Sequence, residues 1–588
     1  MPITQAQITE LLTGQRKRQD LGRATKQEHR LRMHSLTARS VTLTDATADR
    51  NPATRDFLNN VRSRLTAEKY ERFRQVYRSP LPTAVLSEEI HEALAKVFDG
   101  RNPTETYQFT AESLEEDWRA YRTDDLGGRD AWRSEGVTTL RQRPNGVVVV
   151  DLKEQGDGRP RPYWYVADSA AVCHYELLDQ VQFDHLILSG PVVERVRTYY
   201  VFDDEYYRMV EHAGDTVTVV TEVAHDLGYC PARFFWTDAV DSADPAVKRS
   251  PLSAQLAELD EYLWTELSKR INNQFALYHI TQAIEVACDY ESDNERCEKG
   301  VLVSTRGLGA ILDGHGHARG CPVCARNRWI GPGTIIEVPE PDEDGGDYSE
   351  AIRIVTVPTD NLEFNLKNCT LMRQTIFNSV VGSSMEPLND QAVNEKQVMS
   401  FWESRKAALR QLAANFEAVQ TWAEATICRL RYGELFVACE IDMGSDWFIL
   451  SSQDLLELYE KCRAQGSDAA VLDFLQDQYL QSLHRDNPEQ YQRARILTDL
   501  LPARHLTRTD LKELFASGGL EARDYALTLN LSALAARFER ENGPLVEFAS
   551  LLPYDEKITR IADALRAYLP APSIDNPPVP EEGEGDNE

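Results

Sequence analysis

The chain has 588 residues, of which 42% are hydrophobic, and a formal net charge of −30 at pH 7. This length suits roughly three or four ordinary domains or one elongated subunit, and the charge argues against tight binding of nucleic acid, which requires concentrated Lys and Arg. The sequence has neither a run of about 18 apolar residues nor an apolar signal segment, so we expect a cytoplasmic protein with reduced thiols and no membrane span.

The two ends of the chain differ in charge. Residues 1–40 carry eight basic and three acidic side chains, whereas the last eighteen residues carry six acids and no base. We expect an N-terminal arm of one or two helices at 1–54, and an acidic, disordered tail at 571–588 because a segment of Pro and acids with few apolar residues does not pack.

Two patterns occupy the first half of the chain. Apolar residues repeat at helical spacing over 55–98, which predicts helices. Residues 137–236 contain runs such as GVVVVDL and VERVRTYYVF, rich in β-branched and aromatic residues and separated by turn residues. This second pattern predicts an antiparallel meander.

Three helical segments then follow one another. Ser250 as N-cap and Pro251 as first helical residue predict a helix over 251–279, and a second is predicted over 361–381. The longest, about 39 residues from 394, should end before Gly433. Its expected buried stripe comprises Val398, Phe401, Leu409, Leu412, Phe416, Val419, Ala423 and Ile427. After a short strand at 434–443, we expect helix to about residue 568.

Residues 281–357 form a separate insert of predicted strands and loops, poor in apolar residues and rich in Gly and Pro. Within it, C-P-V-C places Cys321 and Cys324 where two thiolates can turn toward one tetrahedral ion. Cys288 and Cys297 can complete a set of four if CDYESDNERC doubles back, although their spacing is wider than usual.

We expect this cysteine set to hold structural zinc. Four sulfur ligands leave no coordination position open for water, and a segment without its own core can draw folding energy from a metal. His315 or His317 could replace one ligand. Unligated reduced thiols are the main alternative, and a redox pair is another.

Signatures of catalysis are absent from the sequence. It contains no P-loop, no H-E-x-x-H and no G-x-S-x-G, so we expect no enzyme. The acidic stretch PDEDGGD, with Asp342, Glu343, Asp344 and Asp347, lacks the downstream glutamate of an EF-hand loop and is expected to be a solvated loop.

The order of these parts resembles the portal protein of tailed bacteriophages. DLGYCPARFFW (226–236) looks like the strand and turn that precede the first stem helix of that family, and KRSPLSAQLAELDEYL looks like the entry to this helix. SVVGSSMEPLNDQAVNEKQVMSFWESRKAALRQLAANFEAVQ looks like the tunnel loop and the long wing helix. The resemblance covers roughly residues 55–570. It does not extend to the cysteines, so the metal is not carried over from the family.

This resemblance implies an elongated α+β subunit with a wing, a two-helix stem, a small clip insert, a long wing helix and a helical crown. The implied parts are the first part of the wing at 55–249, stem helix one at 250–280, the clip at 281–357, stem helix two at 358–381, the tunnel loop at 382–394, the second part of the wing at 395–500 and the crown at 501–570.

The resemblance also implies a function. Twelve subunits would form a ring at one capsid vertex of the virion, assembled in the host cytoplasm, through which double-stranded DNA is packaged and ejected. Its partners would be terminase, the head–tail adaptor, the major capsid protein and the scaffold. Brief contacts to DNA phosphates would come from Ser383, Ser384, Asn389, Asn394 and Lys396. A zinc-containing nucleic-acid-binding protein and, less favoured, a metalloenzyme remain as alternatives.

Overall fold

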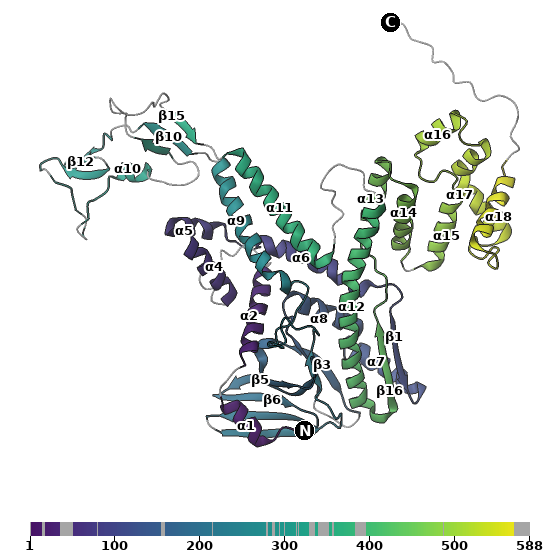
Figure 1. Ribbon diagram of the computed structural model, residues 1–588, viewed down its shortest axis with the longest axis horizontal. Coiled ribbons are helices and arrows are strands. Elements are labelled where there is room, and N and C mark those ends of the chain that lie inside the picture. The colour runs from purple at the N-terminus through teal and green to yellow at the C-terminus, as the bar shows by residue number, and fades with distance from the viewer. Residues whose placement is uncertain are drawn as a thin grey trace, which may run out of the picture. The chain divides into compact units, whose positions relative to one another are not determined.

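The chain is a mixed α+β protein, 56% helical and 19% strand with several small sheets, as the sequence predicts at this level (Figure 1). It divides into two compact units, one formed by 1–384 and 407–445 and the other by 385–406 and 446–588. The computed structural model describes residues 2–14, 18–35, 51–78, 80–153, 159–214, 216–277, 280–284, 288–292, 294–298, 300–307, 309–312, 314, 317–327, 335–338, 352–355, 358–382, 395–485 and 487–569.

The described part of residues 1–54 contains two complete helices that pack within the first unit. Helix α1 (Gln5–Thr13) buries Ile8 against the five-stranded sheet. Helix α2 (Gln19–His34) buries Leu21 and Ala24 in the core beneath that sheet. Most cations of α2 are neutralised by acids of the same unit, as Arg30 is by Asp260 at 2.5 Å.

The helices expected over 55–98 are present as α4 (Pro52–Arg64), α5 (Ala67–Val76) and α6 (Pro82–Ala95). Three further elements were not predicted from the sequence. They are strand β1 (Thr104–Phe109) and helices α7 (Glu112–Asp124) and α8 (Gly128–Arg141). Strand β1 pairs with a strand more than three hundred positions later, so its partner leaves no local signal.

The single meander expected over 137–236 is instead divided between two sheets. One has the order β3–β2–β9, and the other is a five-stranded meander, β4–β5–β6–β7–β8. Their strands are β2 (Val147–Leu152), β3 (Pro162–Ala167), β4 (Val172–Leu177), β5 (Phe183–Val193), β6 (Val196–Phe202), β7 (Tyr206–Ala213), β8 (Thr216–Ala224) and β9 (Ala232–Phe234). Val147, Val149 and Phe234 join residues of the meander in one buried core.

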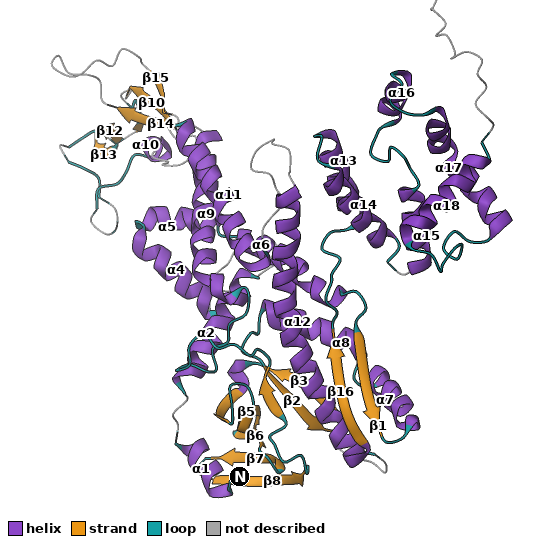
Figure 2. Ribbon diagram, turned by 45° about the vertical axis from the view of Figure 1, so that its right-hand side comes forward, coloured by secondary structure: helices purple, strands orange, loops and turns teal. Residues whose placement is uncertain are grey.

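Two helices lead into and out of the insert. The first starts as a 3₁₀ turn, η3 (Ser253–Gln255), and continues as α9 (Leu256–Leu277). The helix therefore begins later than predicted: Leu252 is the N-cap of this turn and Pro251 precedes it, although the Ser250 Oγ accepts from the Ser253 backbone N–H at 3.2 Å. The second is α11 (Thr359–Val381), which packs along α9 (Figures 1 and 2).

The insert contains two small sheets, each of three strands in its described part. Strand β10 (Ile280–Ile284) lies between β14 (Ile335–Val338) and β15 (Ile352–Val355). The other sheet consists of β11 (Glu291–Ser292), β12 (Glu295–Glu298) and β13 (Val301–Ser304), and the short helix α10 (Pro322–Asn327) follows.

The longest helix has nearly its predicted bounds, as α12 (Glu395–Tyr432). It ends where expected, because Gly433 has a φ of 59°, a left-handed conformation that glycine adopts at little cost. Of its expected stripe, the side chain of Val398 is not described, and the other seven members are buried. Strand β16 (Phe436–Asp442) follows and pairs antiparallel with β1.

The second unit is helical, as expected. Phe401 and Trp402 pack with α13 (Ser452–Ala464) and α14 (Ala469–Leu483), and Phe538 lies in a separate core. The remaining helices are α15 (Pro488–Asp499), α16 (Arg508–Ala516), α17 (Ala522–Asn542) and α18 (Tyr554–Ala567). Among the residues that the structure describes, no helix combines the length and apolar character needed to cross a membrane.

Candidate metal centre

The four predicted cysteines of the insert come together in the fold. The sulfur atoms of Cys288, Cys297, Cys321 and Cys324 all lie within 4.8 Å of one another. The Cys288–Cys321 and Cys297–Cys324 pairs are separated by 3.9 and 3.5 Å. Sulfurs around one tetrahedral ion at 2.3 Å would lie about 3.8 Å apart. The cluster is therefore a candidate metal site of four sulfur donors.

A short hairpin brings the first two cysteines together. Strand β11 pairs antiparallel with β12, where Cys297 lies, so the segment after Cys288 doubles back as the sequence analysis required. The backbone N–H of Cys297 also donates to the carbonyl of Tyr290 at 2.9 Å. The wide spacing between Cys288 and Cys297 is thus taken up by a hairpin.

Cys321 and Cys324, the other two cysteines, are attached to the turn between β12 and β13. Gly300 lies in the turn between β12 and β13, with a φ of 85°. Its carbonyl accepts from the backbone N–H of Cys321 at 2.9 Å, and Gly320 bridges Val301 of β13. The C-P-V-C knuckle is therefore held against the same small sheet that carries Cys297.

Backbone N–H groups are directed at the sulfurs. Desolvation is the largest single effect on the pKa of the Cys321 thiol and raises it, but backbone hydrogen bonds from Cys324 and Val323 and side-chain hydrogen bonds from Cys297 and Cys288 together lower it to about 7. The same kind of bond, from the Gly300 N–H, lowers the pKa of Cys297, against a larger opposing effect of desolvation. These donors favour the thiolate, the ligand form of cysteine, at Cys321, whereas desolvation raises the pKa values of Cys297 and Cys324 overall.

Most of the other residues named by the sequence analysis lie outside the described part of the chain. His317 is exposed and is not one of the four grouped residues. His315 and the acidic stretch at 342–347 lie outside the described residues, as do Ser383, Ser384, Asn389 and Asn394. Lys396 lies in the first turn of α12, but its side chain is not described. Within the described ranges, the four cysteines are the only group of three or more His, Cys, Asp or Glu placed to share an ion.

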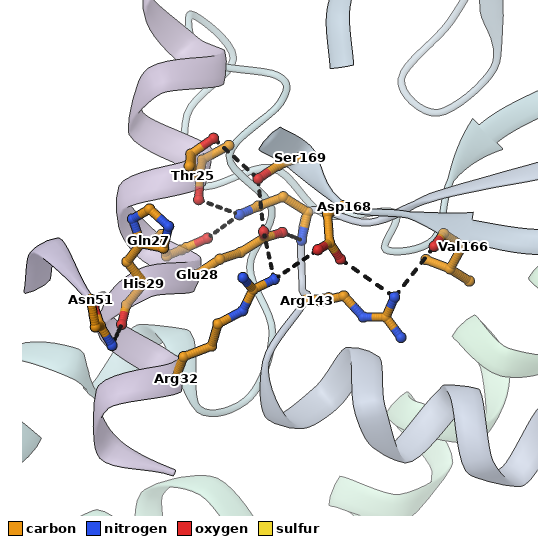
Figure 3. Close-up of polar contacts among 12 residues, drawn as sticks. Thr25, Gln27, Glu28, His29, Arg32, Asn51, Arg143, Val166, Asp168 and Ser169 are labelled. Atoms are coloured by element: carbon orange, nitrogen blue, oxygen red, sulfur yellow. Dashed lines mark hydrogen bonds and ion pairs between the residues drawn. The ribbon is translucent and has the colours of Figure 1, made fainter. Parts of the chain in front are cut away.

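A second polar cluster, which the sequence analysis missed, surrounds Glu28 of α2 (Figure 3). This carboxylate is 1% exposed. It accepts from the Ser169 hydroxyl at 2.8 Å and from the Asn145 backbone N–H at 3.3 Å. Arg32 lies 3.8 Å from it and donates to Asp168 at 3.1 Å. The cluster joins α2 to η2 (Ser169–Ala171) and to the start of β2.

The buried position of Glu28 changes its acidity. Desolvation raises its pKa from 4.5 to about 7, although Ser169, Arg32 and Asn145 partly oppose the shift. No sequence motif distinguishes Glu28 from other glutamates on polar helices, so only the packing of α2 identifies it. The cluster has the properties of a structural joint, since its carboxylate is inaccessible.

Comparison with known proteins adds no assignment: no protein-family model matches the chain, and no curated protein matches it.

Proposed function

We propose that the chain is a subunit of a portal-like ring, the channel for packaging and ejecting DNA at one capsid vertex. The observation that carries the proposal is an uncovered apolar surface on α11. Phe364, Leu366 and Leu371 are 67%, 56% and 59% exposed, and the first buried residue of this helix is Cys369. Exposed apolar side chains gathered on one element are typical of a protein–protein contact.

In a ring, a neighbouring subunit would cover the exposed apolar side chains of α11. Phe364 and Leu371 are seven residues apart and therefore lie on one face of α11. On α9, no residue after Leu267 is buried among the described ones, and Leu277 is 74% exposed. In the proposed ring, the two helices form the stem, and each stem packs against its neighbours through these faces.

The order of elements supports the portal assignment in particular. A wing with strands is followed by one stem helix, an insert, a second stem helix and then the 38-residue α12. In this proposal, the insert is the clip that docks terminase and later the head–tail adaptor. The loop at 382–394 faces the DNA, with Lys396 as the nearest cation.

We further propose that the cysteine cluster holds one zinc ion with a structural role. Zinc accepts four thiolates in a tetrahedron, and the set then leaves no position for a substrate or a catalytic water. The residues of the clip that the structure describes bury few apolar side chains, chiefly Leu302 and Cys321. The metal would therefore supply much of the free energy that folds the clip.

Native mass spectrometry of the purified full chain tests the ring. The proposal predicts a closed oligomer of about twelve copies, and the same oligomer after removal of residues 571–588, because an acidic tail with few apolar residues has little to pack. A monomer at micromolar concentration would contradict the proposal. The zinc assignment is tested separately, by metal analysis.

A further inference from the structure

A cavity of about 370 Å³ lies in the first unit, where the entry to α9, the end of α11 and the middle of α12 meet. This volume is within the range of small-molecule sites in proteins. Its apolar lining comes from α6, α11 and α12 and includes Leu94, Val380, Ala408 and Leu412. Its polar lining comes largely from the segment between β9 and α9, which supplies Trp236, Thr237, Asp238, Arg249 and Ser250. The cavity therefore combines an apolar part with a small set of polar groups, as ligand sites do.

The backbone that carries the polar lining is held from two sides. Asn415 of α12 accepts from the backbone N–H and the hydroxyl of Thr237, at 3.1 and 3.0 Å, and donates to the Phe235 carbonyl at 3.1 Å. The buried Lys248 donates to the Thr237 carbonyl at 3.3 Å. These contacts fix the segment within the fold, so the cavity is preformed and a ligand need not order it.

Three donors in the lining have no acceptor among the described residues. Trp236 is 4% exposed, and its buried indole N–H has no partner. Ser250 is fully buried, and its Oγ accepts from the Ser253 backbone N–H at 3.2 Å, but its hydroxyl donates to no described residue. The exposed guanidinium of Arg249 also makes no ion pair or hydrogen bond with the described side chains. Because buried donors are nearly always satisfied, this set suits a ligand with acceptor oxygens, above all a carboxylate.

A carboxylate alone does not account for Asp238. This residue lies opposite Arg249 in a short hairpin, because the Arg249 backbone N–H donates to the Asp238 carbonyl at 2.8 Å and Ala239 bridges Lys248 in the same register. Opposite residues of a hairpin project to one face, and both side chains line the cavity, yet no ion pair joins them. An unpaired anion beside an unpaired cation matches a zwitterion.

We infer that this cavity binds a free α-amino acid with an apolar side chain, such as leucine, methionine or phenylalanine. Its carboxylate pairs with Arg249 and accepts from the Ser250 hydroxyl, its ammonium pairs with Asp238, and its side chain occupies the apolar part of the cavity. A terminal residue of a peptide carries only one of these two charges, so a free amino acid fits better than a peptide. The inference does not depend on the proposed ring, because the cavity lies within one unit.

Calorimetric titration of the unaltered full chain tests the ligand class. Leucine should bind saturably at millimolar concentration or below. Isocaproate, which is leucine without the ammonium, and isoamylamine, which is leucine without the carboxylate, should each bind at least about tenfold more weakly, because each loses a charge-assisted contact. Absence of saturable binding by leucine, methionine and phenylalanine would overturn the inference. Equal binding of leucine and isocaproate would also overturn it, since the cavity would then be a site for simple anions.

Two substitutions test the position of the ligand. Asp238→Asn should weaken leucine binding about tenfold without weakening isocaproate, whereas Arg249→Gln should weaken both. The controls Glu194→Gln and Arg195→Gln alter two exposed charges in the turn between β5 and β6, and should leave leucine binding unchanged. Equal leucine affinity in the Asp238 variant and the controls would show that the ligand binds elsewhere, and would contradict the assignment.

Discussion

The sulfur atoms of Cys297 and Cys324 lie 3.5 Å apart, although one belongs to strand β12 and the other to helix α10. Neither element is large enough to have its own core. Two hairpin turns and the hydrogen bond from Cys321 to Gly300 bring the two thiols together. A contact this close between distant cysteines, with the other two within 4.8 Å, is the basis of the first two predictions.

The purified chain should contain about one zinc ion per copy without added metal. Changing Cys321 and Cys324 to Ser should abolish this content and unfold the clip, while the far-ultraviolet signal of the rest of the chain persists. Elemental analysis measures the metal, and limited proteolysis locates the unfolded segment. Cys173→Ser, in strand β4, is the matched control and should retain the metal. A zinc content near zero in the unaltered protein would refute the site.

Gly300 should be more important for the metal than other glycines of the clip. Its φ of 85° strains any other residue, so Gly300→Ala should cost about 1–2 kcal/mol and displace both Cys297 and the Cys321 knuckle. We expect weaker metal binding, measured as faster zinc transfer to a coloured chelator. Gly307→Ala is the control, because nothing lies within 4 Å of an added Cβ there. Equal transfer rates in the two variants would show that the turn does not hold the site.

The contrast between predicted and observed elements has a physical cause. The sequence predicts α12 almost to the residue, because a long apolar stripe and Gly433 are local signals. It predicts the cysteine set because C-P-V-C is itself a local signal. It does not predict β1, whose Thr104 pairs with Asp442, or the burial of Glu28. Both depend on contacts between parts of the chain that are far apart in sequence.

Glu28 should make stability depend on pH. Its pKa in the fold, about 7, lies above its ordinary 4.5, so between these values the folded protein retains a proton that the unfolded chain releases. Stability therefore falls as pH rises through this window. Glu28→Gln removes the effect, and should gain up to about 3 kcal/mol relative to the unaltered protein between pH 4.5 and 8.

Urea unfolding of the two proteins, followed by tryptophan fluorescence at several pH values, measures this difference. The exposed Glu10→Gln variant controls for loss of one surface charge. If the stability difference between Glu28→Gln and the unaltered protein does not change with pH, the pKa of Glu28 is not raised in the fold. Burial then does not have the effect assigned to it.

The uncovered face of α11 should be required for assembly and not for folding. Phe364→Glu with Leu371→Glu places two charges where neighbouring stems would meet, and should reduce the ring to monomers because buried unpaired charge is costly. The thermal midpoint of the monomer should change little, since both side chains are exposed. Leu529→Glu with Leu551→Glu alters two exposed leucines of the second unit and should leave the oligomer intact. Rings that persist in the first variant would place the subunit contact elsewhere.

The central claim is that copies of this chain close into a ring, and negative-stain electron microscopy of the purified full chain tests it most directly. End-on views should show a ring of about twelve repeats around a central hole. The α11 variant should give only small single particles in the same buffer. A uniform field of isolated, asymmetric particles from the unaltered protein would contradict the account.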